Sequence, residues 1–407
     1  MASTTVTYFP VDNGDMTLIA LGDKQATKIL IDCNIRGAAD DPEEDTRNVA
    51  KDLRARLKRD SKKRPYVDAF LLSHPDQDHC RGLQNHFYLG PPESYPDDDK
   101  PDLEKRIFIR EIWSSPLVFR RASKSLPLCD EARAFHSEAR RRVKVNQDRK
   151  FSGVEEGDRV LILCEDKDGK TDDIDPILVK LDQSFSRINW SQNTFFTARL
   201  LGPLELSDDE DVEEELGKNR ASVILNMTLA SDEALSAVGR FLSGGDAEVA
   251  IWERLWEKYR NNTVALQYDM LQTPHHCSWH SLSYDSWSDL REKAKVCQNA
   301  RSALSQILPA GTIVASSSPI HDDDNDPPCY GAKCEYESMV KSANGKFYCT
   351  GEYPSSKAVA PLEFVVSDAG GFELVGAQGS LARPAAVASG LSFPNKPVVP
   401  NKPAGFA

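Results

Sequence analysis

The sequence predicts an α/β protein, and three observations lead to this prediction. Short apolar runs rich in β-branched and aromatic residues recur along most of the 407 residues, as in buried strands. Segments with the apolar spacing of helices separate many of these runs, which is typical of α/β architectures. A hydrophobic fraction of 40% and six tryptophans are enough for a large core.

The first part of the chain is expected to form a β-meander, a surface helix and a buried strand. Asp12-Asn13-Gly14-Asp15 is a turn signal between two strand-like runs. Val49, Leu53 and Leu57 recur every four residues, which indicates a helix with a narrow apolar stripe. The expected elements are strands at 6–10, 16–21 and 28–32, a helix at 45–60, a strand at 66–72 and a helix that begins within 79–88.

Residues 91–157 are expected to elaborate the core as a helical, basic insertion, with a strand at 107–113 and a helix at 131–145. The favoured interpretation of this helix is a solvated charged face, because such faces are common on surface helices. The alternative is a basic lip for an anionic substrate. The basic residues concerned are Arg133, Arg140, Arg141, Arg142 and Lys144.

The rest of the chain continues the alternation and ends in a polar tail. Helix 247–260 carries aromatic residues at helical spacing, which indicates core packing. The acidic run 205–215 is expected to be a surface loop or a frayed helix. Residues 379–407 contain few large apolar residues, so we expect a disordered tail after a single domain at 1–378. The remaining expected strands lie at 159–164, 177–181, 195–201, 222–228, 238–243, 270–273, 312–316 and 362–367.

Composition narrows the cellular setting and the class of partner. A net charge of −13 argues against broad, nonspecific attraction to nucleic acid. No hydrophobic run reaches membrane-spanning length, and the first residues lack the features of a signal peptide. The nine cysteines show no regular framework, which suits buried thiols in a reducing compartment. We therefore expect a soluble cytoplasmic protein with no membrane partner.

The segment from Leu71 to His79 carries the strongest chemical signal. It places His74, Asp76, Asp78 and His79 directly after the apolar run 66–72, where α/β folds carry their chemistry. Imidazole and carboxylate at this density suit one or two divalent cations of the zinc, manganese or iron type. Asp15 and Asp32 are candidates for carboxylates that orient the ligating imidazoles, because each ends a turn or strand.

Two further clusters follow strand-like runs, Asp246 first and then the pair His275 and His276. This ordered set resembles the metallo-β-lactamase fold superfamily, whose signature His-x-His-x-Asp-His is followed by a strand-end Asp and a late His. Asp76 stands where the second His is usual, which is similar to the hydrolase domain of ComEC-type competence proteins and their stand-alone soluble relatives. The motifs that carry the resemblance are 11–15, 30–33, 219–223, 242–246 and 274–278.

The resemblance implies an αββα sandwich of two mixed β-sheets and a binuclear metal site. One ion would be held by His74 and Asp76, and the other by Asp78, His79 and one of the two late histidines. Asp246 would bridge them. Between the two late histidines we favour His275 as the ligand over His276, and we place Ser278 and His321 near the ligands or the substrate.

The chain departs from the family pattern in three places. Cys277 replaces the usual Gly, and Ser317 to Asp322 replaces the usual ending. The additional His of the first metal site has no clear counterpart, because His136 lies in the expected insertion. These departures concern substrate recognition and the first metal, and they leave the second metal's ligand set complete.

The resemblance implies a hydrolase with two divalent ions, zinc in the first place, in which Asp78 and Asp246 serve catalysis and a bridging hydroxide attacks. Phosphodiesters are the expected substrates, either nucleic acid or a nucleotide. The alternatives are hydrolysis of a non-phosphate ester, an amide or a nucleotide-derived metabolite, and iron-dependent redox chemistry on the same fold.

Overall fold

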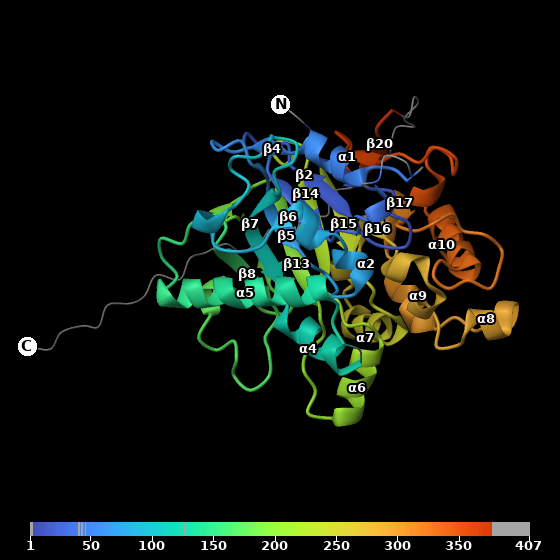
Figure 1. Ribbon diagram of the computed structural model, residues 1–407. Helices are drawn as coiled ribbons and strands as arrows, with labels where there is room; N and C mark the ends of the chain where they lie inside the picture. The colour runs from blue at the N-terminus through green and yellow to red at the C-terminus, as the bar shows by residue number, and fades with distance from the viewer. Residues whose placement is uncertain (1–2, 40, 42–43, 45, 126, 377–407) are drawn as a thin grey trace, which may run out of the picture.

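Two β-sheets pack face to face in the computed structural model, which describes residues 3–376 apart from 40, 42, 43, 45 and 126. Helices cover the outer faces of the sheets, with α5 on one side and α9 and α10 on the other (Figure 1). The protein is an αββα sandwich with two mixed sheets, which confirms the fold class expected from the sequence.

The larger sheet combines an antiparallel meander with a parallel half. Its strand order is β20-β19-β1-β2-β3-β5-β7-β8-β9, and β3, β5, β7, β8 and β9 run parallel. Short strands β4 and β6 pair with β5 and β7. The bounds are β1 Thr5–Tyr8, β2 Thr17–Ala20, β3 Lys28–Ile31, β4 Lys58–Arg59, β5 Pro65–Leu71, β6 Phe87–Tyr88, β7 Ile107–Ser114, β8 Arg159–Leu163, β9 Leu178–Val179, β19 Leu362–Val366 and β20 Phe372–Leu374.

The smaller sheet has the order β10-β13-β14-β15-β16-β17-β18. Its first strands are antiparallel, and β15 to β18 run parallel. A separate hairpin joins β11 and β12. The bounds are β10 Ser184–Phe185, β11 Arg187–Ile188, β12 Ser191–Gln192, β13 Phe196–Gly202, β14 Ile224–Ala230, β15 Val238–Ser243, β16 Tyr268–Gln272, β17 Ile307–Ala315 and β18 Lys346–Cys349.

The α-helices of the described residues lie mainly between the strands of the parallel regions, as crossover connections require. None of these helices is long and apolar enough to span a membrane. Their bounds are α1 Val49–Arg56, α2 Gln77–Cys80, α3 Leu83–His86, α4 Pro116–Ser125, α5 Asp130–Asp148, α6 Glu210–Lys218, α7 Val249–Tyr259, α8 Trp287–Leu290, α9 Gln298–Leu304 and α10 Tyr330–Ser342.

Three apolar clusters hold the layers together. The central one joins the inner faces of both sheets, for example Trp113 of β7 and Phe241 of β15, which are fully buried. A second lies between the smaller sheet and its helices, where Trp252 of α7 is fully buried. The third lies between the larger sheet and its helices, including Phe135 of α5. Apolar burial of this extent is the main stabilising term of the fold.

Several local expectations need correction. The helix expected within 79–88 is two short helices, because Gly82 adopts a left-handed φ of +81° between them. The backbone here is held by hydrogen bonds to residues 33 and 35 instead of continuing the helix. The acidic run 205–215, expected as a surface loop or a frayed helix, forms the helix α6 over part of its length, capped by Asp209 and packed through buried Leu216.

The segment 91–157 contributes to the framework of the larger sheet. Its strand β7 lies between β5 and β8 rather than outside the core. Helix α5 packs its apolar face on the same sheet through residues such as Phe135. At least the part from β7 to α5 is therefore a layer of the sandwich rather than an appendage. The tail expected at 379–407 lies outside the described residues.

Candidate metal centre

The three ligand clusters meet at the carboxyl ends of strands from both sheets. His74, Asp76, Asp78 and His79 follow β5 in the larger sheet, whereas Asp246 follows β15 in the smaller one. The late histidines follow β16, which pairs in parallel with β15. Backbone hydrogen bonds tie the loops together, including one of 3.0 Å from the His275 amide to the Gly245 carbonyl.

Three groups of described residues could hold a metal ion. Asp78, His79, Asp246 and His276 form the larger group, with one ligand atom from each within 4.8 Å of the others, and a separate group of Asp15, Asp32 and His79 shares His79 with it. Nε2 of His79 lies 2.8 Å from Oδ1 of Asp246. Nε2 of His276 lies 3.4 Å from the same carboxylate and 3.2 Å from Oδ2 of Asp78. All except Asp78 are buried. Two imidazoles and two carboxylates are a ligand set that suits a divalent transition metal.

A second group of this kind contains His74, Asp76 and, again, Asp246. Nε2 of His74 lies 3.4 Å from Oδ1 of Asp76, and its Nδ1 lies 3.2 Å from the carbonyl oxygen of Ala221. Asp246 thus belongs both to this smaller group and to the larger group.

Two buried carboxylates fix the orientation of the ligating imidazoles. Nδ1 of His79 donates a hydrogen bond of 2.9 Å to Oδ2 of Asp32, which leaves Nε2 facing Asp246. Nδ1 of His276 lies 3.4 Å from Oδ1 of Asp15. Asp32 is held in turn by the amide of Ser73 at 2.7 Å. Outer carboxylates of this kind set the tautomer of a metal-ligating histidine.

The buried carboxylates favour positive charge in the centre. Burial would lower the pKa of His79, but Asp246 and Asp32 raise it well above its usual range. Burial also lowers the pKa of His276, but Asp246 and Asp15 outweigh this effect and raise that pKa to about 10. Without a metal these histidines therefore hold protons at neutral pH in order to balance the carboxylates around them.

Unpaired polar atoms in the centre provide a test of whether a metal fits. Among the described residues, buried Oδ2 of Asp246 and Nε2 of His276 make no hydrogen bond of good geometry, although Nε2 of His276 lies 3.2 Å from the Asp78 carboxylate. A buried polar atom without a partner is costly. Both atoms belong to the residues of the larger group, so a divalent cation there would satisfy them, and the residues present fit such an ion.

The turn with the two late histidines has an unusual backbone. His275, His276 and Cys277 have left-handed φ values of +50°, +53° and +69°, a region that non-glycine residues seldom occupy and that is associated with functional sites. His276 rather than His275 enters the larger group, so it takes the place that the sequence analysis favoured for its neighbour.

His275 is buried beside the centre rather than within it. Its Nδ1 lies 3.3 Å from Oε1 of Glu248, and its Nε2 lies 3.9 Å from Oδ2 of Asp246. Ser278 is buried and caps the next turn by accepting a hydrogen bond from the amide of His280. His321 is exposed, and no group that could hold a metal among the described residues includes it.

Sequence reasoning missed Arg220 as a member of the centre. Its guanidinium contacts Asp76, and Nη1 lies 3.9 Å from Oδ2 of Asp246. Its Nε lies 3.3 Å from Oε1 of Glu248. The sequence did offer a signal for Arg220, because this basic residue lies within the motif 219–223, just before β14. Arg220 gives the centre a cationic donor at the edge of the smaller group.

No protein-family model and no curated protein matches the chain.

Proposed function

We propose that the protein is a metal-dependent hydrolase of the metallo-β-lactamase type, similar to the ComEC-type branch, and that it cleaves phosphodiesters. The observation that carries this proposal is the arrangement of the histidines. His74, His79 and His276 all turn Nε2 toward the carboxylates of the centre, while their Nδ1 atoms face a backbone carbonyl or an outer carboxylate. Such preorganisation serves an ion rather than a proton network alone.

The two groups divide the ligands between two ions. Asp78, His79 and His276 would hold one ion, and His74 and Asp76 would hold the other, with Asp246 shared. Zinc is our first choice because imidazole nitrogen and carboxylate oxygen are among its ordinary donors. Manganese and iron remain alternatives for the same donor set.

Bound divalent ions would supply Lewis acidity and activate water at neutral pH. The protein's own residues supply the rest. Asp78 and Asp246 hold the carboxylate charge at the reacting position, whereas Arg220 offers a guanidinium to an anionic substrate. His275, placed between Glu248 and Asp246, is the candidate that hands a proton to the leaving oxygen.

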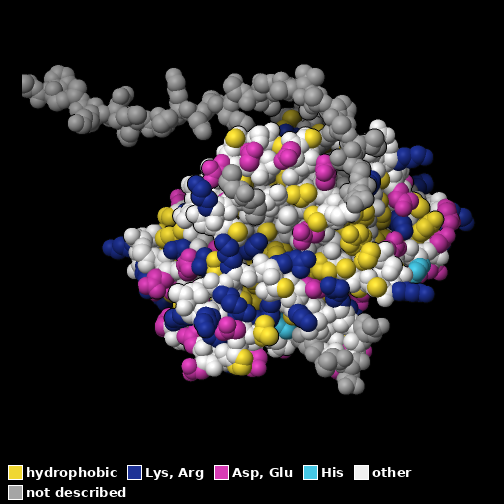
Figure 2. Space-filling view, turned by 90° about the horizontal axis from the view of Figure 1, so that it is seen from above, with side chains coloured by type: hydrophobic (Ala, Val, Ile, Leu, Met, Phe, Trp, Pro, Cys, Tyr) yellow, Lys and Arg dark blue, Asp and Glu magenta, His cyan; other side chains and the backbone are white. Residues whose placement is uncertain are grey.

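The charge of the molecule favours a compact substrate. The net charge of −13 opposes a long polyanion. On the face seen in Figure 2, basic side chains lie among acidic and apolar ones rather than in one continuous stripe. A nucleotide-sized phosphodiester therefore fits better than a polymer that must track along the surface.

A hydrolysis screen tests the proposal. Purified protein would be loaded with zinc or manganese and offered a chromogenic phosphodiester, cyclic and linear dinucleotides, RNA and DNA, while its metal content is measured. Asp78→Ala is the test variant, because Asp78 is the least buried member of its group. Asp98→Ala, a change of an exposed carboxylate in the loop after β6, is the matched control.

We expect phosphodiester cleavage by the wild type and the control. The test variant should lose more than the roughly 100-fold that loss of an outer-shell partner causes. A folded Asp78→Ala protein with full activity, or a wild type that cleaves no phosphodiester with either metal, would refute the proposal. Bound iron with visible colour would instead favour redox chemistry.

A further inference from the structure

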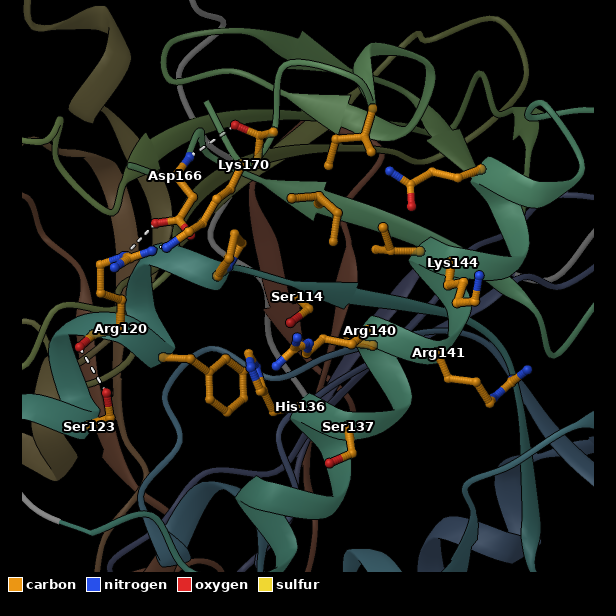
Figure 3. Close-up of a pocket in the computed structure, with 18 of the residues that line it drawn as sticks. Ser114, Arg120, Ser123, His136, Ser137, Arg140, Arg141, Lys144, Asp166 and Lys170 are labelled. Carbon is orange, nitrogen blue, oxygen red and sulfur yellow. Dashed lines mark hydrogen bonds and ion pairs between the residues drawn. The ribbon is translucent and has the colours of Figure 1, made fainter. Parts of the chain in front are cut away.

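A large pocket lies beside the metal centre, and the metal ligands do not line it. It has a volume of about 1030 Å³ and lies between α4, α5, the end of β7 and the segment after β8. Figure 3 shows side chains from these elements converging on one hollow. The volume is at the upper end of the range for small-molecule sites.

The pocket joins an apolar wall to a basic rim. Phe119, Val143, Ile162 and Ile174 are among the apolar lining residues. The rings of His136 and Phe119 are in contact, with centroids 4.6 Å apart. Burial is the main cause that lowers the pKa of His136, and the nearby charge of Arg140 lowers it further. The imidazole is tilted by 42° from the phenyl ring, and its own flat face is a surface against which another ring can stack. The charged lining residues are Arg120, Arg140, Arg141, Lys144, Lys170 and Asp166.

Most of these cations already have an anionic partner. Arg120 forms two hydrogen bonds, of 2.6 and 2.8 Å, to Asp166. Arg141 pairs with Glu138 at 2.7 Å, and the lysines lie near Asp148 and Asp168. These pairs resolve the alternatives for the helix at 131–145 only in part, because much of its basic charge is balanced within the fold.

Arg140 is the exception on this rim. Its side chain is exposed, and within the described part of the chain no hydrogen bond or ion pair engages its guanidinium. In Figure 3 it points into the hollow near His136 and Ser114. An unpaired guanidinium beside a flat ring suits a ligand that carries a phosphate next to a base.

The pocket and the metal loop share a boundary. Ser114 ends β7, whose preceding residue Trp113 pairs with Leu71 at the end of β5, directly before the metal loop. On the other side, Leu128 lines the pocket, and the Sγ of the next residue, Cys129, lies 3.9 Å from the carbonyl of Pro75 in the metal loop. A ligand in the pocket therefore lies next to the loop that carries His74 and Asp76.

We propose that this pocket binds the nucleotide portion of the substrate, with the base stacked on His136 and a phosphate at Arg140. The proposal rests on the phosphodiesterase function proposed above, because it assigns the part of the substrate next to the bond that is cut. It identifies the substrate class as a small nucleotide diester.

Calorimetric titration of the metal-loaded protein tests the pocket without turnover. The probes are adenosine monophosphate, adenosine and inorganic phosphate. Arg140→Glu and His136→Ala are the test variants. Arg133→Glu is the matched control, because Arg133 is exposed on the same helix, pairs with Asp130 and does not line the pocket.

We expect the wild type to bind adenosine monophosphate more tightly than adenosine. Arg140→Glu should weaken adenosine monophosphate by about 10-fold or more, the usual scale of a lost charged hydrogen bond. His136→Ala should weaken both nucleosidic probes and leave inorganic phosphate unchanged, whereas Arg133→Glu should match the wild type.

Two results would overturn the pocket assignment: no binding of adenosine monophosphate by the wild type, or equal affinity in the wild type and Arg140→Glu. The hydrolysis screen tests the proposed function independently of the pocket. Cleavage of the chromogenic diester together with either of these results would reject the pocket and keep the function. Nucleotide binding that depends on Arg140, in a protein that cleaves no diester, would reject the function and keep the pocket as a nucleotide site.

Discussion

The hydrogen bonds of Asp32 predict that Asp32→Asn disables the metal centre although it changes almost no volume. The carboxylate accepts three hydrogen bonds, one from the Ser73 amide to Oδ1 and two to Oδ2, from the Ser73 hydroxyl and Nδ1 of His79. An asparagine has one acceptor oxygen in place of two. It therefore cannot serve the Ser73 amide and the imidazole together.

Each orientation of the new amide has a cost. If its oxygen stays with the Ser73 amide, its NH₂ group faces Nδ1 of His79, so the proton of the imidazole moves to Nε2. Nε2 lies 2.8 Å from Asp246 and is the atom that should bind the metal. If the amide is reversed, two buried donors oppose each other, which costs about 1–3 kcal/mol of folding free energy.

We expect Asp32→Asn to bind zinc about 10 to 100-fold more weakly, or about 1.4 to 2.7 kcal/mol, as for other outer-shell partners. Competition with a chromophoric chelator measures this affinity. Asp68→Asn is the control. Asp68 is also a buried carboxylate, and it accepts a hydrogen bond of 2.8 Å from the Lys28 amide, but it lies outside the metal centre. A folded Asp32→Asn protein with wild-type zinc affinity would refute the reasoning.

Three further predictions follow from the same geometry. The carboxylates around His276 overcome the effect of burial and raise its pKa to about 10, so zinc must displace its proton. Zinc affinity should therefore rise from pH 6 to pH 8, and calorimetry in two buffers of different ionisation enthalpy should show proton release. Equal binding heats in the two buffers would contradict this prediction. Gly245→Ala should lower the free energy of unfolding by about 2 kcal/mol or more, because φ is +50° and an added Cβ would lie 2.8 Å from a neighbouring side chain. Gly37→Ala is the control, because its added Cβ meets no atom within 4 Å, and it should lose far less stability in urea titrations. Equal losses in the two variants would argue against this prediction. Cys129 should be alkylated with a midpoint near pH 7. A hydrogen bond from the neighbouring thiol, together with the amides that start α5, outweighs burial and lowers the pKa of Cys129 to about 7. Peptide mass spectrometry at pH 7 measures the order of alkylation, and faster reaction of exposed Cys334 would disprove the prediction.

The sequence predicted the strands well because most of them are apolar runs bounded by turn residues. Helix α4 was missed because Leu117, Val118 and Phe119 form one continuous apolar run that does not show helical spacing. Helix α10 was missed although its buried residues Ala332, Tyr336, Met339 and Val340 have helical spacing, since the preceding Pro327 and Pro328 indicate a loop. Local pattern therefore defined the sheets better than the helices that cover them.

The ligand groups could be anticipated for the same reason, since each follows a strand. Two details could not. Arg220 reaches Asp76 across 144 positions of sequence, and only the folded loops bring them together. The sequence offered no means of choosing between His275 and His276, because the turn is left-handed at both residues and side-chain alternation in extended backbone does not apply there.

The pairing of β1 with β19 has a consequence for biosynthesis. Thr7 of β1 donates a hydrogen bond of 3.1 Å to Glu363 of β19, 356 positions later. As the ribosome releases the chain from its amino terminus, β1 can pair with β2 early but must wait for its other neighbour until nearly the whole sandwich has been synthesised. Such distant partners slow folding and leave a strand edge open to other chains. Nascent chains that stop before β19 should therefore be a principal source of aggregation, and chaperone binding to them should cease once β19 emerges.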